Sequence, residues 1–200
     1  MKLRGLYAIT PEHAARERLL EQVAQALEGG IALLQYRRKT RQDPSEARAL
    51  ASLCRARGVP FIVNDDVELA LACRADGVHL GRDDGSIAAA RSKLKNKVLG
   101  ISCYDSLEAA RAAVAARANY VAFGSVFASP TKPSAVRAPL TLFAHAKPLG
   151  VPLVAIGGIT LENAPALLKA GADALAVISD LFDAPDVAAR ARAYGKLFKQ

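Results

Sequence analysis

The chain has 200 residues, 52% of them hydrophobic, and a formal net charge of +8. This length supports one substantial core, and no stretch reaches the roughly 18 uncharged apolar residues that a membrane span requires. The first apolar run contains a charge and lacks a small-residue cleavage pattern, and the three cysteines have no metal-like spacing. These features argue against a signal peptide and predict a cytoplasmic protein with reduced thiols and no membrane partner.

The predicted elements alternate along the whole chain between short apolar runs and segments of helical periodicity. The apolar runs predict strands at residues 3–10, 31–36, 61–63, 78–81, 98–102, 120–127, 151–156 and 174–178. The periodic segments predict helices at residues 14–28, 43–57, 67–73, 86–94, 105–117, 140–147, 161–170 and 185–198. A long, polar and basic loop is expected between residues 128 and 139.

This alternation indicates the fold class. Strands that are apolar on both faces, each followed by a helix, require a parallel sheet covered by helices. Eight such units close into a (βα)8 TIM barrel, an α/β fold for which 200 residues is a compact length, so we expect one domain over residues 1–200. A doubly wound open sheet is the alternative, which is disfavoured because no Gly-x-Gly-x-x-Gly follows the first strand.

The positive charge raises nucleic acid as a partner. The densest basic group, Arg37-Arg38-Lys39 with Arg41, directly follows an apolar run, whereas the other basic residues are spread along the chain. Aromatic residues make up only 6% of the chain, which leaves few for base stacking, and no helix-turn-helix or zinc-finger spacing is present. A small phosphorylated substrate explains a local basic cluster equally well, and we expect no nucleic-acid partner.

Two neighbouring predicted strands end in acidic residues. Phe61-Ile-Val63 stops at Asn64-Asp65-Asp66, and the strand at 78–81 is followed by Asp83-Asp84. Carboxylates delivered by adjacent strand ends suit a hard divalent cation, most often Mg²⁺ shared with a substrate phosphate. The alternative is that these residues cap the following helices. The same ending on two strands favours the metal.

Catalytic sites of such barrels lie at the C-terminal ends of the strands. The residues found there are mainly cations, acids, small hydroxyl donors and glycines, with one amide and one apolar residue: Arg37, Lys39, Asn64, Asp65, Asp84, Ser102, Ser129, Thr131, Lys132, Gly157, Gly158, Ile178 and Ser179. No Ser-His-Asp or Cys-His arrangement is expected among them. The ends of the last two strands can offer backbone N–H groups to one phosphate, while the cations can hold a second anion. The set predicts a site for two phosphorylated molecules, one of them a diphosphate.

From Tyr7 to Ser179 the chain resembles the thiamine phosphate synthase family. The resemblance is carried by Tyr7-Ala-Ile-Thr10, Gln35-Tyr-Arg-Arg-Lys39, Asn64-Asp-Asp66, Gly77-Val-His-Leu-Gly-Arg-Asp-Asp84, Gly100-Ile-Ser102, Ser129-Pro-Thr-Lys132, Val154-Ala-Ile-Gly-Gly-Ile159 and Ala176-Val-Ile-Ser179. It implies a transferase that joins an aminopyrimidine methyl diphosphate to a thiazole phosphate, or to its carboxylated form, with release of diphosphate. It implies one Mg²⁺ per subunit, held by Asp65 and Asp84.

The resemblance also implies roles for individual residues. The pyrimidine diphosphate would be bound by Gln35, Tyr36, Arg37, Arg38, Lys39, Asn64, Ser102 and Lys132. The thiazole phosphate would be bound by Ser129, Pro130, Thr131, Gly158, Ile178 and Ser179. Of these, the catalytic residues would be Arg37, Lys39, Lys132 and Ser102. Homo-oligomerisation is left open.

Alternatives follow from the same residues. A thiazole tautomerase would not need the diphosphate-binding cations, and a non-catalytic regulatory barrel would be expected to have lost a metal carboxylate. Arg82 and Ser125 depart from the common family pattern and leave fine substrate preference open. His79 lies on a buried strand and is expected to be a hydrogen-bonded core residue, and Cys103 a structural thiol.

Overall fold

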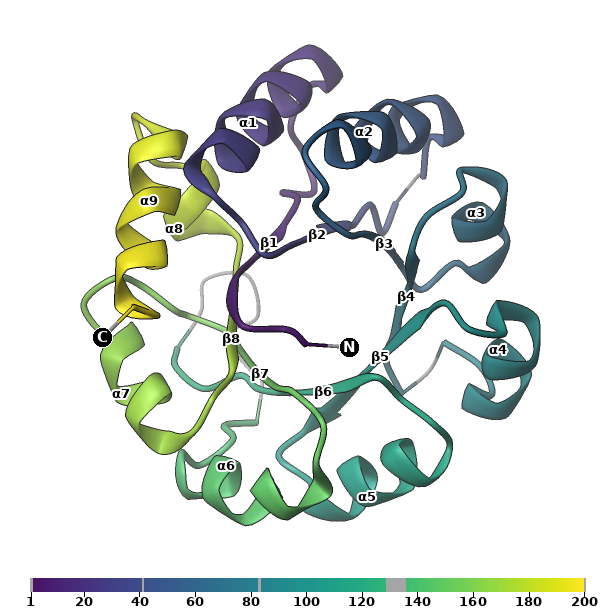
Figure 1. Ribbon diagram of the computed structural model, residues 1–200, viewed down its shortest axis with the longest axis vertical. Coiled ribbons are helices and arrows are strands. Elements are labelled where there is room, and N and C mark those ends of the chain that lie inside the picture. The colour runs from purple at the N-terminus through teal and green to yellow at the C-terminus, as the bar shows by residue number, and fades with distance from the viewer. Residues whose placement is uncertain (1, 41, 83, 129–135, 200) are drawn as a thin grey trace.

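The computed structural model describes residues 2–40, 42–82, 84–128 and 136–199. Its eight parallel strands form a closed barrel in chain order, β1 to β8, and the helices surround it (Figure 1). The predicted TIM barrel is therefore confirmed. Within the described ranges no helix is long and apolar enough to cross a membrane.

The elements have the following bounds. The strands are β1 (Gly5–Ile9), β2 (Leu33–Tyr36), β3 (Phe61–Asn64), β4 (Gly77–Leu80), β5 (Val98–Tyr104), β6 (Tyr120–Phe123), β7 (Leu153–Ile156) and β8 (Ala174–Val177). The helices are α1 (Arg16–Gly29), α2 (Pro44–Ala56), α3 (Val67–Ala72), α4 (Ile87–Leu94), α5 (Leu107–Ala115), α6 (Thr141–Ala146), the 3₁₀ helix η1 (Lys147–Leu149), α7 (Ala164–Ala170), α8 (Ser179–Phe182) and α9 (Val187–Leu197).

Side-chain caps fix where several helices begin. Asp43 accepts from two backbone N–H groups at the start of α2, where Pro44 occupies the first turn. Asp66 accepts from the Leu69 N–H at 2.8 Å and so begins α3. The capping alternative from the sequence thus holds for Asp66, whereas the neighbouring Asp65 is left for another role.

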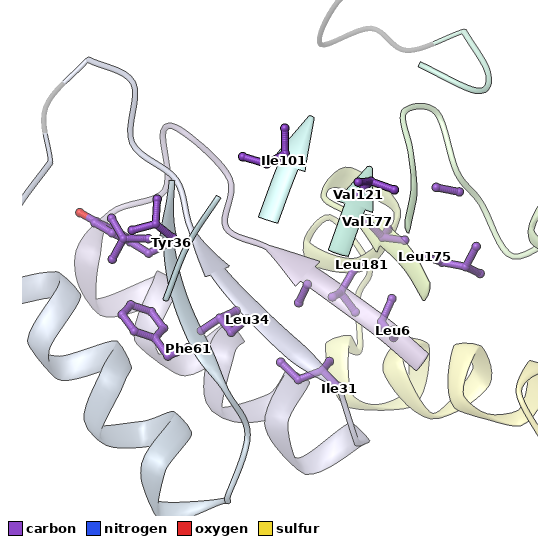
Figure 2. Close-up of a cluster of buried hydrophobic side chains, with 14 of the residues drawn as sticks. Leu6, Ile31, Leu34, Tyr36, Phe61, Ile101, Val121, Leu175, Val177 and Leu181 are labelled. Carbon is purple, nitrogen blue, oxygen red and sulfur yellow. The ribbon is translucent and has the colours of Figure 1, made fainter. Parts of the chain in front are cut away.

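Two apolar layers follow from the alternation of side chains along each strand. Leu33 of β2 belongs to the cluster inside the barrel, whereas Leu34 and Tyr36 belong to the larger cluster between the strands and the helices. Figure 2 shows Leu34 and Tyr36 beside Phe61 in this outer layer. Gln35 therefore shares the inward face with Leu33, and this face leads to the C-terminal mouth of the barrel.

Two local expectations were wrong. The sixth strand ends at Phe123 and not at residue 127, because Ser125 exchanges hydrogen bonds with Val136 and Ala138 and interrupts the ladder. The N–H groups of residues 126 and 127 then donate to the carbonyls of Ile156 and of residue 157. The short helix α8, directly after β8, was not predicted.

Candidate active site

A cavity of about 780 Å³ opens at the C-terminal ends of the strands. Its lining includes ten residues predicted from sequence to bind substrate or metal: Gln35, Arg37, Lys39, Asn64, Asp65, Asp84, Ser102, Gly158, Ile178 and Ser179. The structure therefore brings together, in one space, residues from strands on opposite sides of the barrel. One side carries the cations and acids, and the other carries the turn after β7 and the start of α8.

Some predicted residues are not in this set. Ser129, Pro130, Thr131 and Lys132 lie outside the described residues. The structure does not bring Tyr36 and Arg38 to the cavity, because both face the helix layer. The Tyr36 hydroxyl accepts from the backbone N–H of Asp43 at 3.0 Å.

Arg38 is engaged in the wall of the barrel. Its guanidinium forms a two-pronged ion pair with Glu46, at 2.9 and 2.8 Å, and Glu46 is 3% exposed. It also donates to the backbone carbonyls of Glu12 and Ala14. Arg38 thus anchors the loop after β1 to α2, and its side chain does not line the cavity in which the resemblance placed it.

The carboxyl groups of Asp65 and Asp84 meet at the cavity wall. Burial, followed by the hydrogen bond and the negative charge of Asp84, raises the pKa of Asp65 to about 7, against the opposing effect of Lys39 and Arg37. One oxygen of Asp84 accepts from the Gly81 N–H at 2.6 Å, which fixes its direction. Asp65 has a left-handed backbone, with φ of 65°, which Asp tolerates better than most residues.

This carboxyl pair fits a divalent cation. A positive ion between two adjacent carboxylates removes the repulsion that raises the pKa of Asp65. No group of three or more His, Cys, Asp or Glu side chains is placed to hold an ion in the part of the chain that the structure describes. The remaining ligands would be water and substrate phosphate, which is the coordination that Mg²⁺ favours over a complete protein cage.

The cationic loop after β2 is held by two residues that sequence reasoning missed. Thr10, at the end of β1, accepts from the backbone N–H of Arg37 at 2.9 Å. Glu12 accepts from the Arg37 guanidinium at 3.1 Å, from the Lys39 N–H at 2.6 Å and from both the N–H and the hydroxyl of Thr40. The only signal in the sequence was the resemblance of Tyr7-Ala-Ile-Thr10 to a family motif, to which no role was attached.

Glu12 is held in its charged form by these partners. Burial alone would raise the pKa of Glu12, but the hydrogen bonds from Thr40 and Lys39 and the charge of Arg37 outweigh it, so the pKa is lowered. The carboxylate therefore binds the loop firmly at neutral pH. It fixes the backbone of Lys39 and the direction of the Arg37 side chain relative to the carboxyl pair.

The opposite side of the cavity is built from main chain. Gly158 has φ of 64°, and a Cβ there would lie 2.2 Å from the carbonyl oxygen of Ala128, so only glycine fits. The Asn163 side chain donates to the Gly158 carbonyl at 2.9 Å and accepts from the Thr160 N–H at 2.9 Å. Ser179 begins α8 beside this turn, in keeping with the predicted phosphate site.

The structure pairs His79 with Ser102, and a tyrosine takes the position that an acid has in a Ser-His-Asp arrangement. The His79 Nε2 lies 2.8 Å from the Ser102 hydroxyl, and its Nδ1 lies 2.9 Å from the hydroxyl of Tyr120. Burial lowers the pKa of His79 to about 4, only partly opposed by the charge of Asp84. The imidazole is neutral at neutral pH and its second partner is a phenol in place of a carboxylate, so the prediction of a hydrogen-bonded core histidine is confirmed.

The comparisons with known proteins agree with this geometry. The family model described as thiamine monophosphate synthase matches residues 6–181. The chain belongs to this family.

Individual relatives cover nearly the whole chain. The thiamine-phosphate synthase of Aromatoleum aromaticum is 57% identical over 202 residues, which span 98% of this chain and 97% of that protein. That of Chromobacterium violaceum is also 57% identical, over 98% and 97% of the two chains. Among solved structures, a thiamine phosphate pyrophosphorylase from Pyrococcus furiosus superposes with a TM-score of 0.86 at 36% identity, covering 99% of this chain and 96% of that one.

Proposed function

We propose that this cavity joins an aminopyrimidine methyl diphosphate to a thiazole phosphate, giving thiamine phosphate and diphosphate, or to its carboxylated form, in which case CO₂ is released as well. The family assignment makes the protein a transferase of thiamine biosynthesis. The observation that supports this chemistry best is the division of the cavity. Cations and a carboxyl pair lie on one side, and the turn at Gly158 with the start of α8 lies on the other.

The proposed reaction requires charge stabilisation more than acid or base catalysis. The bond between the pyrimidine methylene and the diphosphate oxygen breaks, and its electron pair leaves with the diphosphate. The electron-rich aminopyrimidine stabilises the methylene cation that remains, and the lone pair of the thiazole nitrogen then forms the new carbon–nitrogen bond. With the plain thiazole phosphate no proton has to move, which suits a cavity whose histidine is buried and neutral.

Different residues of the cavity would bind the diphosphate, the metal, the pyrimidine and the thiazole phosphate. Arg37, Lys39 and, from sequence, Lys132 would bind the diphosphate and stabilise the charge that it gains on leaving. Mg²⁺ held by Asp65 and Asp84 would supply further charge neutralisation at the same oxygens. Gln35, Asn64 and Ser102 would orient the pyrimidine. Gly158, Ile178 and Ser179, together with Ser129, Pro130 and Thr131, would hold the thiazole phosphate.

The setting of the reaction is part of the proposal. One Mg²⁺ per subunit, a cytoplasmic location and small phosphorylated substrates as the partners are consistent with the carboxyl pair and the cavity. A thiazole tautomerase or a regulatory barrel would not require Arg37, Lys39, Asp65 and Asp84 to line the same space as they do here. The arrangement therefore favours the synthase.

Single substitutions test these assignments. We expect Asp65→Ala, Arg37→Ala and Lys132→Ala each to lower turnover on the order of 10²–10³-fold, the usual loss for one electrostatic stabiliser. Glu68→Ala is the matched control, because Glu68 follows Asp65 closely in sequence but lies on α3, where its side chain is 70% exposed and pairs with Lys93. Turnover of Asp65→Ala or Lys132→Ala within a few-fold of the parent would refute those roles.

A further inference from the structure

A continuous chain of buried hydrogen bonds runs beneath the cavity. It joins two of the residues that are predicted to bind the pyrimidine. The Gln35 Nε2 donates to the Tyr7 hydroxyl, which lies 2.8 Å from the hydroxyl of Tyr120. Tyr120 lies 2.9 Å from the Nδ1 of His79, whose Nε2 lies 2.8 Å from the Ser102 hydroxyl. The five residues come from β2, β1, β6, β4 and β5, so the chain crosses the barrel interior.

Burial removes water from the middle of this chain. Tyr7, Tyr120 and His79 are 1%, 0% and 7% exposed, so each must satisfy its polar atoms through its neighbours in the chain. Burial is the largest effect that raises the pKa of Tyr7 and of Tyr120, and both hydroxyls therefore keep their hydrogens. The chain has one hydrogen for each link.

The direction of the first link sets the direction of all the others. Tyr7 accepts from Gln35, so its single hydrogen points to Tyr120. The Tyr120 hydrogen then points to the Nδ1 of His79, and the neutral imidazole carries its hydrogen on Nε2 and donates to Ser102. The Ser102 hydroxyl hydrogen is left to point into the cavity, and Gln35 keeps its carbonyl oxygen as an acceptor.

These two ends match one edge of an aminopyrimidine. The amino group is a donor and the adjacent ring nitrogen an acceptor, so they complement the Gln35 carbonyl oxygen and the Ser102 hydroxyl. A pyrimidine with an oxo group in place of the amino group presents the opposite pattern, an acceptor beside a ring N–H. Because the chain links the two ends, neither can reverse without all five residues reversing together.

We propose that Tyr7, Tyr120 and His79 are positioning residues that hold Ser102 as a donor and Gln35 as an acceptor toward the aminopyrimidine. The proposal rests on the proposed function for the identity of the ligand. It also gives His79 a role distinct from that of a base, since an imidazole with its hydrogen on Nε2 cannot accept the Ser102 proton.

The glycine of the Gly100-Ile-Ser102 motif serves this arrangement. A Cβ at Gly100 would lie 2.0 Å from the Tyr120 ring and 2.2 Å from its hydroxyl oxygen. The absence of a side chain on β5 thus leaves the space in which the Tyr120 ring stacks on the His79 imidazole, with centroids 5.6 Å apart.

The wild-type protein provides the first test, which needs no turnover. Nitrogen-15 NMR of histidine-labelled protein distinguishes the two neutral tautomers. We expect His79 to carry its hydrogen on Nε2, both free and with the pyrimidine diphosphate bound. A hydrogen on Nδ1 in the bound state would overturn the proposal, whether or not the protein makes thiamine phosphate.

Variants provide the second test. We expect Tyr120→Phe and Tyr7→Phe to weaken binding of the pyrimidine diphosphate, measured by calorimetry, by roughly 10–100-fold, with thiazole phosphate binding unchanged. Both should also lose most of the preference for the amino over the oxo pyrimidine, and Tyr120→Phe should mix the His79 tautomers. Equal losses for both substrates would show a merely structural role.

A matched variant distinguishes the loss of a link in this hydrogen-bond chain from the loss of any buried tyrosine hydroxyl. Tyr194 is fully buried and its hydroxyl donates to Asp180 at 2.7 Å, outside the chain. Tyr194→Phe should leave the His79 tautomer and the amino-over-oxo preference unchanged. A change as large as that of Tyr120→Phe would contradict the proposal.

Discussion

Replacing Asp84 by Asn tests the carboxyl pair through stability as well as activity. The substitution keeps the shape of the side chain and an oxygen that can accept from Gly81, but it removes one of two adjacent negative charges. If the pair exists to hold a cation, the metal-free protein should gain stability from the change, whereas the protein should lose both its response to Mg²⁺ and its turnover.

The expected gain follows from the charges. Two unit charges about 4 Å apart repel by about 4 kcal/mol at an effective dielectric constant of about 20. Asp65 is only half-buried, so solvent screening reduces this to about 1 kcal/mol. The gain should depend on pH, because Asp65 has a pKa raised from 3.8 to about 7 in the folded protein. It should be present at about pH 8, where Asp65 is ionised, and absent at about pH 5, where Asp65 is protonated.

Urea unfolding at the two pH values, with and without Mg²⁺, provides the assay. Asp66→Asn is the matched control, because Asp66 is the adjacent acid, caps α3 and can be replaced by Asn without losing the cap. It should retain stabilisation by Mg²⁺. An Asp84→Asn protein that is less stable than the parent at about pH 8 without metal, or that is still stabilised by Mg²⁺, would show that Asp65 and Asp84 do not form a cation site.

Three further substitutions test the surroundings of the site. Glu12→Gln should raise the KM for the pyrimidine diphosphate on the order of tenfold, through loss of the charge that fixes Arg37, with the KM for the thiazole phosphate unchanged; equal changes in both would contradict this. Gly100→Ala should lower the free energy of unfolding by about 1–3 kcal/mol, since its Cβ overlaps Tyr120, and an unfolding midpoint equal to the parent's would refute the close contact. The pKa of His79 is lowered from 6.5 to about 4 in the folded protein. Between about pH 6.5 and pH 4 the unfolded state therefore binds a proton at His79 and the folded state does not, so the parent should lose about 3 kcal/mol of stability as the pH falls through this range. In His79→Gln that loss should be smaller, and an unchanged acid limb in urea unfolding would contradict the assignment.

The barrel could be predicted because most of the apolar runs end abruptly. Phe61-Ile-Val63 changes to polar residues within one position, and helix caps such as Asp66 follow at once. Where an apolar run continues past the end of its strand, as at residues 124–127, sequence alone placed the boundary too late. The ladder breaks there because Ser125 pairs with Val136, a contact that no local pattern encodes.

The site was predicted less completely than the barrel, for two physical reasons. Side chains at alternate positions of a strand face the barrel interior, but nearly all positions of a strand that is buried on both faces are apolar. The apolar run before Arg37-Arg38-Lys39 therefore does not reveal which of these cations turns outward to Glu46. Contacts between distant elements are also invisible in one sequence. Glu12 reaches the loop after β2 only because β1 and β2 are neighbours in the closed sheet.

Coupling of the two substrates in one cavity, with the help of a divalent cation, can be measured directly. Purified protein should be mixed with the pyrimidine diphosphate, the thiazole phosphate and Mg²⁺, and both diphosphate and thiamine phosphate measured over time. Equal amounts of the two products, lost on addition of EDTA and restored by excess Mg²⁺, are the predicted result. Tight binding of the thiazole phosphate without formation of either product would contradict the synthase activity and favour a tautomerase or a regulatory barrel.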